Sequence, residues 1–213
     1  PHCSGKFALV HNGIVENYSR LKAELVSAGE VFSSETDSEV IVKLIARAYA
    51  GDFFAAVAAA CARLSGSYAI AVLCEDFPGE IVCARYKSPL VAGAGGGALY
   101  VCSDIPTLCG EAEYICTAAD GEFIRICGGE IHFLDAAGRE IPTTFSRVPP
   151  ESRAQEKGRG SYMERESAEI PRALADTLAG LKKADFAQCA RVLRSAKRVF
   201  AVACGTAYHA ALA

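Results

Sequence analysis

The hydrophobic period of this 213-residue sequence changes at Gly66, and this change constrains the fold more than any other feature. Before Gly66, a buried strand over 6–10 leads to a turn at 11–13 and then to helical patterns, the second of which begins with a capping box at Thr36 and Glu39. After Gly66, the pattern is typical of strands. Helices followed by strands predict an α+β layered domain with an antiparallel meander and not a doubly wound fold. The predicted helices cover 18–28, 36–51 and 52–64, and the predicted strands cover 67–74, 80–85, 90–92, 99–102, 123–127 and 130–134.

A stretch rich in Pro, Gly and charge interrupts this periodicity at 142–161 and predicts a linker. Beyond it, two helical patterns at 163–179 and 186–195 precede an apolar strand pattern at 198–203. That strand runs into Cys204-Gly205-Thr206, which is typical of the first turn of a βα unit. The expected division is a first domain over 1–141, a linker over 142–161 and the start of a second domain over 162–213.

Charge and hydropathy argue against two classes of partner. The sequence has 22 Lys and Arg against 25 Asp and Glu, a net charge of −3, and the signs are mixed along the chain, so no basic face for nucleic acid is expected. The longest uncharged apolar stretch, 53–62, is shorter than the roughly 18 residues that a membrane helix needs. We therefore expect neither nucleic acid nor a membrane as a partner.

The ten cysteines lie mostly in apolar runs and never form a C-x-x-C pair. Structural zinc sites need closely paired ligands, so we expect no metal. Buried, reduced thiols are typical of a cytoplasmic protein.

The glycine-rich run Gly93 to Ala98 superficially matches a dinucleotide fingerprint, but a strand follows it instead of a helix, so we interpret it as a hairpin turn and expect no cofactor.

Three short motifs have an ordinary structural interpretation when each is taken alone. His11-Asn12-Gly13 is a turn signal, although an Asn amide and a Gly N–H can also form an oxyanion hole. Asp37 is a first-turn acid that the helix dipole favours. Cys204-Gly205-Thr206 is more often a plain βα turn than a phosphate site.

Taken together, the motifs are more specific. In its motifs and their order, the chain resembles the type 2 glutamine amidotransferases, in particular the members that aminate fructose 6-phosphate. The matching segments of the first domain are 11–17, 34–40, 66–70, 87–91 and 102–104, and those beyond it are 157–158, 162–166, 169–171 and 202–208.

This resemblance implies a four-layer αββα fold of the N-terminal-nucleophile hydrolase kind, followed by the truncated start of an αβα sugar isomerase (SIS) domain. In that family an N-terminal cysteine attacks the amide of glutamine and releases ammonia, which then reaches fructose 6-phosphate. Carried over by position, Asn12 and the N–H of Gly13 match the oxyanion hole, and Asp37 matches the acid that holds the glutamine ammonium. Cys204, Gly205 and Thr206 match the start of the sugar-phosphate site.

The chain begins at Pro1 without an initiator Met and stops inside an apolar run, so we interpret it as an internal fragment. The resemblance implies that the nucleophilic cysteine lies outside this sequence and that Cys3, which has no free α-amino group, does not replace it. We therefore expect the fragment to be inactive, and the intact enzyme to form a homo-oligomer through its isomerase half. Two alternatives remain open: an amidophosphoribosyltransferase-like amidotransferase and a non-catalytic sugar-phosphate-binding protein.

Overall fold

The computed structural model describes residues 1–148, 162–181, 186–203 and 209. The chain divides into two compact units, Pro1–Lys157 and Gly158–Ala213. Each unit is described separately below.

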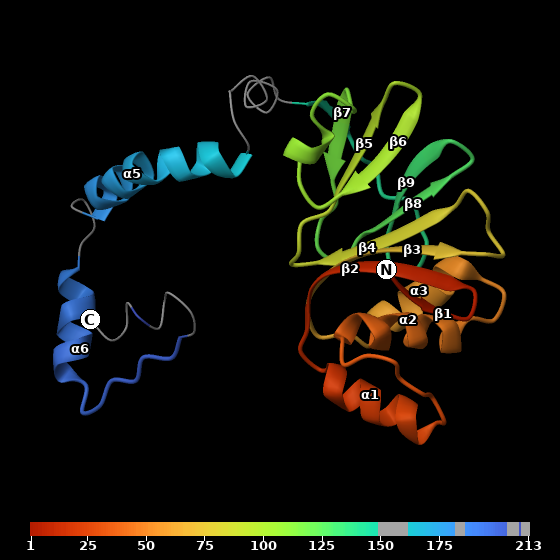
Figure 1. Ribbon diagram of the computed structural model, residues 1–213, viewed down its shortest axis with the longest axis horizontal. Coiled ribbons are helices and arrows are strands. Elements are labelled where there is room, and N and C mark those ends of the chain that lie inside the picture. The colour runs from red at the N-terminus through yellow and green to blue at the C-terminus, as the bar shows by residue number, and fades with distance from the viewer. Residues whose placement is uncertain (149–161, 182–185, 204–208, 210–213) are drawn as a thin grey trace. The chain divides into compact units, whose positions relative to one another are not determined.

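The strands described in the first unit form two antiparallel sheets (Figure 1). The six-stranded sheet has the order β1-β2-β3-β4-β8-β9, and the four-stranded sheet has the order β10-β7-β5-β6. The first consists of β1 (His2–Ser4), β2 (Phe7–Val15), β3 (Gly66–Cys74), β4 (Ile81–Tyr86), β8 (Phe123–Cys127) and β9 (Glu130–Leu134). The second consists of β5 (Val91–Gly95), β6 (Ala98–Cys102), β7 (Tyr114–Thr117) and β10 (Ser146–Arg147), with a 3₁₀ turn at Pro106–Leu108.

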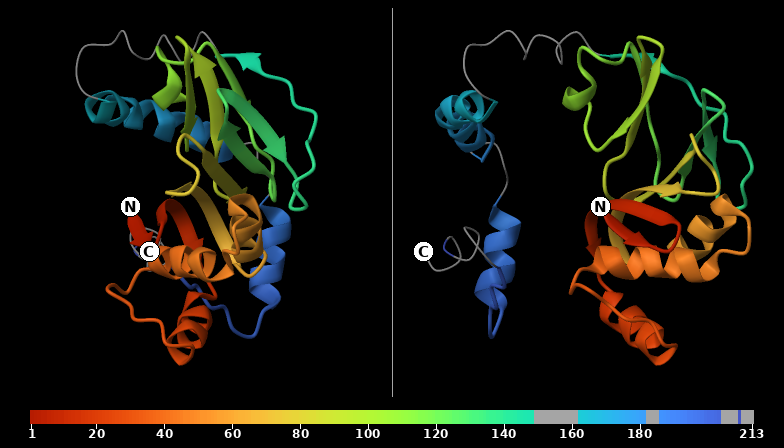
Figure 2. Two further views of the ribbon diagram at one scale, coloured as in Figure 1. Left: turned by 90° about the vertical axis from the view of Figure 1, so that its right-hand side faces the viewer. Right: turned by 45° about the vertical axis from the view of Figure 1, so that its right-hand side comes forward.

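Helices cover one face of the six-stranded sheet and the second sheet covers part of the other (Figures 1 and 2). The helices are α1 (Tyr18–Ser27), α2 (Asp37–Ala48) and α3 (Phe53–Cys61). The apolar stripe of α2 packs with Leu9 and Ile70 in the helix-side core. Cys83, Ala92 and Ile124 belong to a separate core cluster that draws on both sheets. The predicted α+β layering is therefore confirmed, as a helix layer on two sheets.

Local signals set the starts of α2 and α3 and the end of α1 as the sequence predicts, whereas α2 ends at Ala48 and α3 at Cys61, three residues before the predicted ends. The Thr36 hydroxyl accepts a hydrogen bond from the Glu39 N–H at 3.4 Å, and the Asp52 carboxylate accepts one from the Ala55 N–H at 3.0 Å. Gly29, with φ at +93°, follows α1 as its terminator. The glycine run is also confirmed as a hairpin turn, because Gly96 and Gly97 join β5 to β6 with positive φ.

Two predictions about the strands are wrong, and three short strands were missed. Residues 11–13 are not a turn: β2 continues to Val15, because His11, Asn12 and Gly13 pair with Ile70, Ala69 and Tyr68 of β3. The strands do not form one meander, because β5, β6 and β7 leave the first sheet to form the second. The short strands β1, β7 and β10 were not predicted, since pairing defines them more than periodicity does. Because β10 pairs with β7 and Val148 is buried, the first unit continues past residue 141.

The second unit contains α5 (Tyr162–Leu181) and α6 (Ala187–Ser195), close to the predicted helices. The strand expected at 198–203 is absent: these residues have no regular structure, and Val199, Phe200 and Val202 are exposed. A strand needs a partner for its N–H and C=O groups, and no described strand pairs with this segment. Cys204, Gly205 and Thr206 lie outside the described residues. None of the helices in the described ranges is long and apolar enough to cross a membrane.

Candidate active site

Asn12 and Gly13 lie near the end of β2, beside β3. The Asn12 side chain is exposed and lines a cavity of about 190 Å³. Residues of β2 and β3 line this cavity together with Leu90, Val101, Cys102 and Ser103. A polar amide therefore faces a small cavity between segments of the two sheets.

Gly13 occupies a position that only glycine can fill. Its φ is +127°, a conformation that other residues rarely adopt. A Cβ atom at this position would lie 2.2 Å from the carbonyl oxygen of Ser67 and 2.9 Å from Oγ of Ser88. The backbone of β2 thus approaches β3 and the 87–91 motif more closely than a side chain would allow.

A strained turn holds Ser88 against Gly13. Lys87, with φ at +62°, is the one non-glycine residue of the described chain with positive φ, and the Ser88 N–H donates to the carbonyl of Tyr86 at 2.8 Å. This is a γ-turn, which is uncommon. The Asp120 carboxylate accepts hydrogen bonds from the Lys87 N–H at 2.8 Å and from the Arg85 guanidinium at 2.7 Å, so a second loop stabilises the turn.

The first turn of α2 contacts β2 on both sides of Asn12 and Gly13. The Val15 N–H donates to Oδ2 of Asp37 at 2.9 Å, and Nδ1 of His11 lies 3.0 Å from the Ser38 hydroxyl. These contacts bring the 34–40 motif to the 11–17 motif. The other carboxylate oxygen, Oδ1, has no hydrogen bond to a described residue, and the Asp37 side chain is 22% exposed. One oxygen of Asp37 thus fixes the helix to the strand, and the second is open to a cationic ligand.

Glu39 fixes the loop that precedes Asp37. Its carboxylate accepts hydrogen bonds from the backbone N–H groups of Ser33 and Ser34, at 2.8 and 2.7 Å, and from both hydroxyls, at 3.1 and 2.6 Å. Burial alone would raise the pKa of Glu39, but the hydrogen bonds from Ser34 and Ser33 outweigh it and lower the pKa to about 2. A buried, ionised carboxylate therefore organises the entry to α2.

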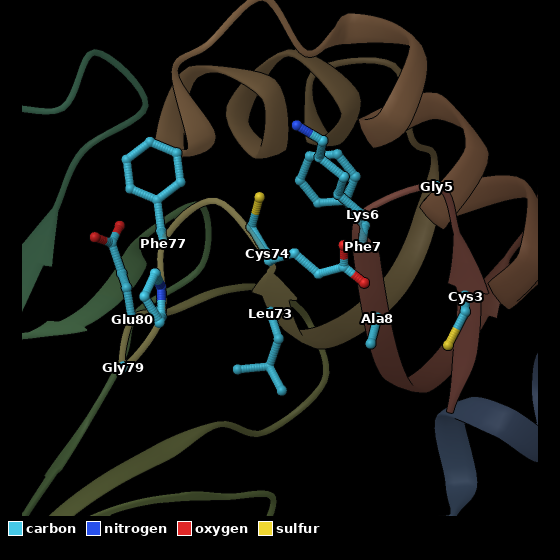
Figure 3. A pocket seen from close by; sticks show the side chains of 12 residues that line it. Cys3, Gly5, Lys6, Phe7, Ala8, Leu73, Cys74, Phe77, Gly79 and Glu80 are labelled. Atoms are coloured by element: carbon cyan, nitrogen blue, oxygen red, sulfur yellow. The ribbon is translucent and has the colours of Figure 1, made fainter.

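The cysteines near these motifs are not placed as nucleophiles. Cys102 lines the cavity beside Asn12, but its thiol donates to the carbonyl of Asp104 at 2.7 Å, and burial raises its pKa. Cys3 lies on β1 and lines a separate cavity of about 360 Å³ (Figure 3). A thiol attacks as its thiolate, and a raised pKa disfavours that form.

The structure therefore joins the 34–40 motif, through Asp37 and Ser38, to the strand that carries Asn12 and Gly13. Cys204, Gly205 and Thr206 lie outside the described residues. Sequence reasoning missed the contributions of His11, Ser38 and Ser88, although all three lie inside the matched motifs. Their position in those motifs was the available signal. Within the described ranges, no group of three His, Cys, Asp or Glu side chains could hold a metal ion.

Curated relatives match the chain over its whole length. The proteins from Symbiobacterium thermophilum and Pyrobaculum aerophilum, both named glutamine–fructose-6-phosphate aminotransferase [isomerizing], are 43% and 39% identical to it. Both alignments cover 100% of this chain, but only 37% and 36% of the relatives. The chain thus spans little more than a third of the length of these relatives.

Solved structures share the fold of about two thirds of this chain. Glutamine phosphoribosylpyrophosphate amidotransferase from B. subtilis superposes with a TM-score of 0.56 at 26% identity, covering 63% of this chain and 30% of that one. A glutamine aminotransferase class-II domain protein from Silicibacter pomeroyi has a TM-score of 0.52 at 22% identity, covering 66% and 71% of the two chains, and supports the fold alone.

The family model described as "Glutamine amidotransferase domain" matches residues 1–110, which include Asn12, Gly13, Asp37 and the contacts that join them. About half of the chain lies within that match, as do the motifs at 11–17, 34–40 and 87–91 that form the candidate site. The chain belongs to the glutamine amidotransferase domain family.

Proposed function

We propose that this chain is part of an enzyme that transfers the amide nitrogen of glutamine to fructose 6-phosphate, giving glucosamine 6-phosphate and glutamate. The observation that carries the proposal is the contact of the first turn of α2 with β2 on both sides of Asn12 and Gly13. Whole-chain identity of 43% to a protein named for this reaction supports the choice of acceptor.

In the glutaminase step, the side-chain amide of Asn12 and the N–H of Gly13 donate to the oxyanion that forms when a thiolate attacks the glutamine amide. Oδ1 of Asp37 pairs with the α-ammonium of glutamine, which distinguishes an amino acid from a simple amide. The collapse of the intermediate releases ammonia and leaves a glutamyl thioester, and water then hydrolyses the thioester to glutamate. The attacking thiolate is assigned to the N-terminal cysteine of the mature family member.

The second half-reaction belongs to a sugar isomerase domain whose start we assign to residues 162–213, after a linker and a glutaminase domain that includes β10. There, Cys204, Gly205 and Thr206 would contact the sugar phosphate through N–H groups and a hydroxyl. We further propose that the enzyme is cytoplasmic and forms a homo-oligomer through this half. The names of the curated relatives support the acceptor, fructose 6-phosphate.

The amidophosphoribosyltransferase alternative is less well supported. A protein of that activity shares the fold, but at 26% identity over 63% of this chain, whereas relatives named for fructose 6-phosphate match the whole chain at up to 43%. A non-catalytic sugar-phosphate-binding protein has no need of an amidotransferase segment. The comparisons therefore favour fructose 6-phosphate as the acceptor.

The test uses the full-length protein that carries this chain. Purified protein is incubated with glutamine and with either fructose 6-phosphate or phosphoribosyl pyrophosphate, and glutamate and amino sugar are quantified. We expect glucosamine 6-phosphate only with fructose 6-phosphate. Glutamate release stimulated by phosphoribosyl pyrophosphate alone would support the alternative, and absence of glutamate release would refute both.

A second test concerns the 213-residue chain by itself. We propose that it does not hydrolyse glutamine, because Cys102 is half-buried with a raised pKa and Cys3 lines another cavity. Glutamate release above a protein-free control, abolished by Cys3→Ala, would contradict this proposal.

A further inference from the structure

His11 is a buried histidine that adjoins both motifs of the candidate site. Its side chain is 2% exposed, and its Nδ1 atom lies 3.0 Å from Oγ of Ser38 and 3.7 Å from Oδ1 of Asp37. The other ring nitrogen, Nε2, is buried and has no hydrogen-bond partner in the described part of the chain. The polar contacts of the ring therefore all lie on its Nδ1 side, toward α2.

These contacts determine which form of the ring is stable. A buried N–H without an acceptor is rarer and more costly than a nitrogen lone pair without a donor, so the proton belongs on Nδ1, where Ser38 accepts it. A second proton on Nε2 would be buried without an acceptor. Burial lowers the pKa of His11, although the negative charge of Asp37 opposes this effect. The ring is therefore neutral at neutral pH.

A neutral ring leaves the charge of Asp37 available. Asp37 on α2 is the charged group that acts on the ring, and the β3 residue opposite His11 is the apolar Ile70. A cationic ring 3.7 Å from Oδ1 would neutralise that oxygen and repel an ammonium ion. A neutral ring instead holds Ser38, next to Asp37, without competing for the carboxylate.

We propose, on the basis of the glutaminase function proposed above, that His11 is a positioning residue that must stay neutral for Asp37 to bind the α-ammonium of glutamine. Side chains alternate along β2, so the ring of His11 and the amide of Asn12 point to opposite faces of the sheet. His11 therefore acts through Asp37 and does not touch the reacting amide. It controls the affinity for glutamine and leaves the chemical step unchanged.

The test compares the KM and kcat for glutamine between about pH 5 and 8 in the full-length protein and in its His11→Asn variant. In the unmodified protein we expect the KM for glutamine to rise about tenfold as the pH falls and His11 gains a proton. A tenfold change corresponds to a shift of one pKa unit in His11 when the ammonium of glutamine binds beside it. Asparagine gains no proton in this range, so the acid rise in KM should be absent in the variant. Activity with ammonia, compared at equal concentrations of free NH3, should have the same pH dependence in both proteins.

His132→Asn is the matched control. His132 is a partly exposed histidine on β9 whose Nδ1 lies 2.8 Å from Glu140, and it contacts neither motif. This variant should keep the acid rise in KM. A KM that is constant with pH in the unmodified protein, or an equal rise in the His11→Asn variant, would overturn the inference about His11. Failure to hydrolyse glutamine at any pH would instead overturn the proposed function.

A spectroscopic measurement keeps the inference testable where His11→Asn does not fold. Nitrogen-15 NMR of the histidine-labelled, unmodified protein should show one neutral ring protonated at Nδ1 that titrates at the same pH as the KM. A ring in this environment that is protonated at Nε2 alone, or cationic at neutral pH, would refute the proposal.

Discussion

Replacing Gly13 with alanine tests the close approach of β2 to β3. The new Cβ would lie 2.2 Å from the carbonyl oxygen of Ser67, so one strand must shift by roughly 1 Å to restore an ordinary contact. Such a shift weakens roughly two ladder hydrogen bonds at about 1 kcal/mol each. The backbone conformation at φ +127° adds about 1–2 kcal/mol.

The expected loss is therefore about 3–4 kcal/mol, a large part of the 5–15 kcal/mol by which a typical domain is stable. Gly96→Ala is the matched control, because Gly96 also has positive φ, at +59°, but nothing within 4 Å of its Cβ position. It should cost only the backbone term of about 1–2 kcal/mol. The free energy of unfolding is measured by urea denaturation. Equal losses in the two variants would show that steric overlap at Gly13 plays no part.

Three further predictions concern the site and its supporting loop. Asn12→Ala should lower the glutaminase kcat by roughly a hundredfold to a thousandfold with little change in the KM, and steady-state kinetics that leave kcat intact would rule out its oxyanion role. Asp37→Asn should weaken glutamine binding by about 1.5–3 kcal/mol and spare ammonia-dependent synthesis; an equal loss with ammonia would make its role structural. Because hydrogen bonds lower the pKa of Glu39 from 4.5 to about 2, its ionisation contributes stability above pH 4.5, and this contribution is lost as the pH falls toward 2. Acid titration of stability should show a loss of about 3 kcal/mol from this group, and a Glu39→Gln variant with the same acid slope would contradict the assignment.

Single residues with local partners made the helices predictable. Thr36 and Asp52 cap α2 and α3 through N–H groups three residues away, and Gly29 ends α1 by its own conformational freedom. These interactions lie within a few residues of sequence, so a single chain segment contains the necessary information. The strands β8 and β9 were predicted with their observed bounds for the same reason, since alternation is a local pattern.

The candidate site was only partly predictable. The sequence motifs identified Asn12, Gly13 and Asp37, but a turn was predicted at 11–13 because Asn-Gly is a turn signal. Pairing with β3, more than 50 residues away in sequence, overrides that preference and makes the segment a strand. The roles of Ser88 and His11 depend on distances across the fold, which periodicity does not contain.

The sequence by itself determined where α2 and α3 begin, the change from helices to strands and the family, because each depends on local propensity or on the order of motifs. Tertiary structure alone decided which strands belong to each sheet, the extension of β2 and the contact of α2 with both sides of Asn12 and Gly13. The physical reason is that backbone N–H and C=O groups and buried side chains must find partners, and these partners lie far away along the chain. For the segment 198–203, no described strand supplies such a partner. The segment therefore has no regular structure, although its sequence pattern is typical of a strand.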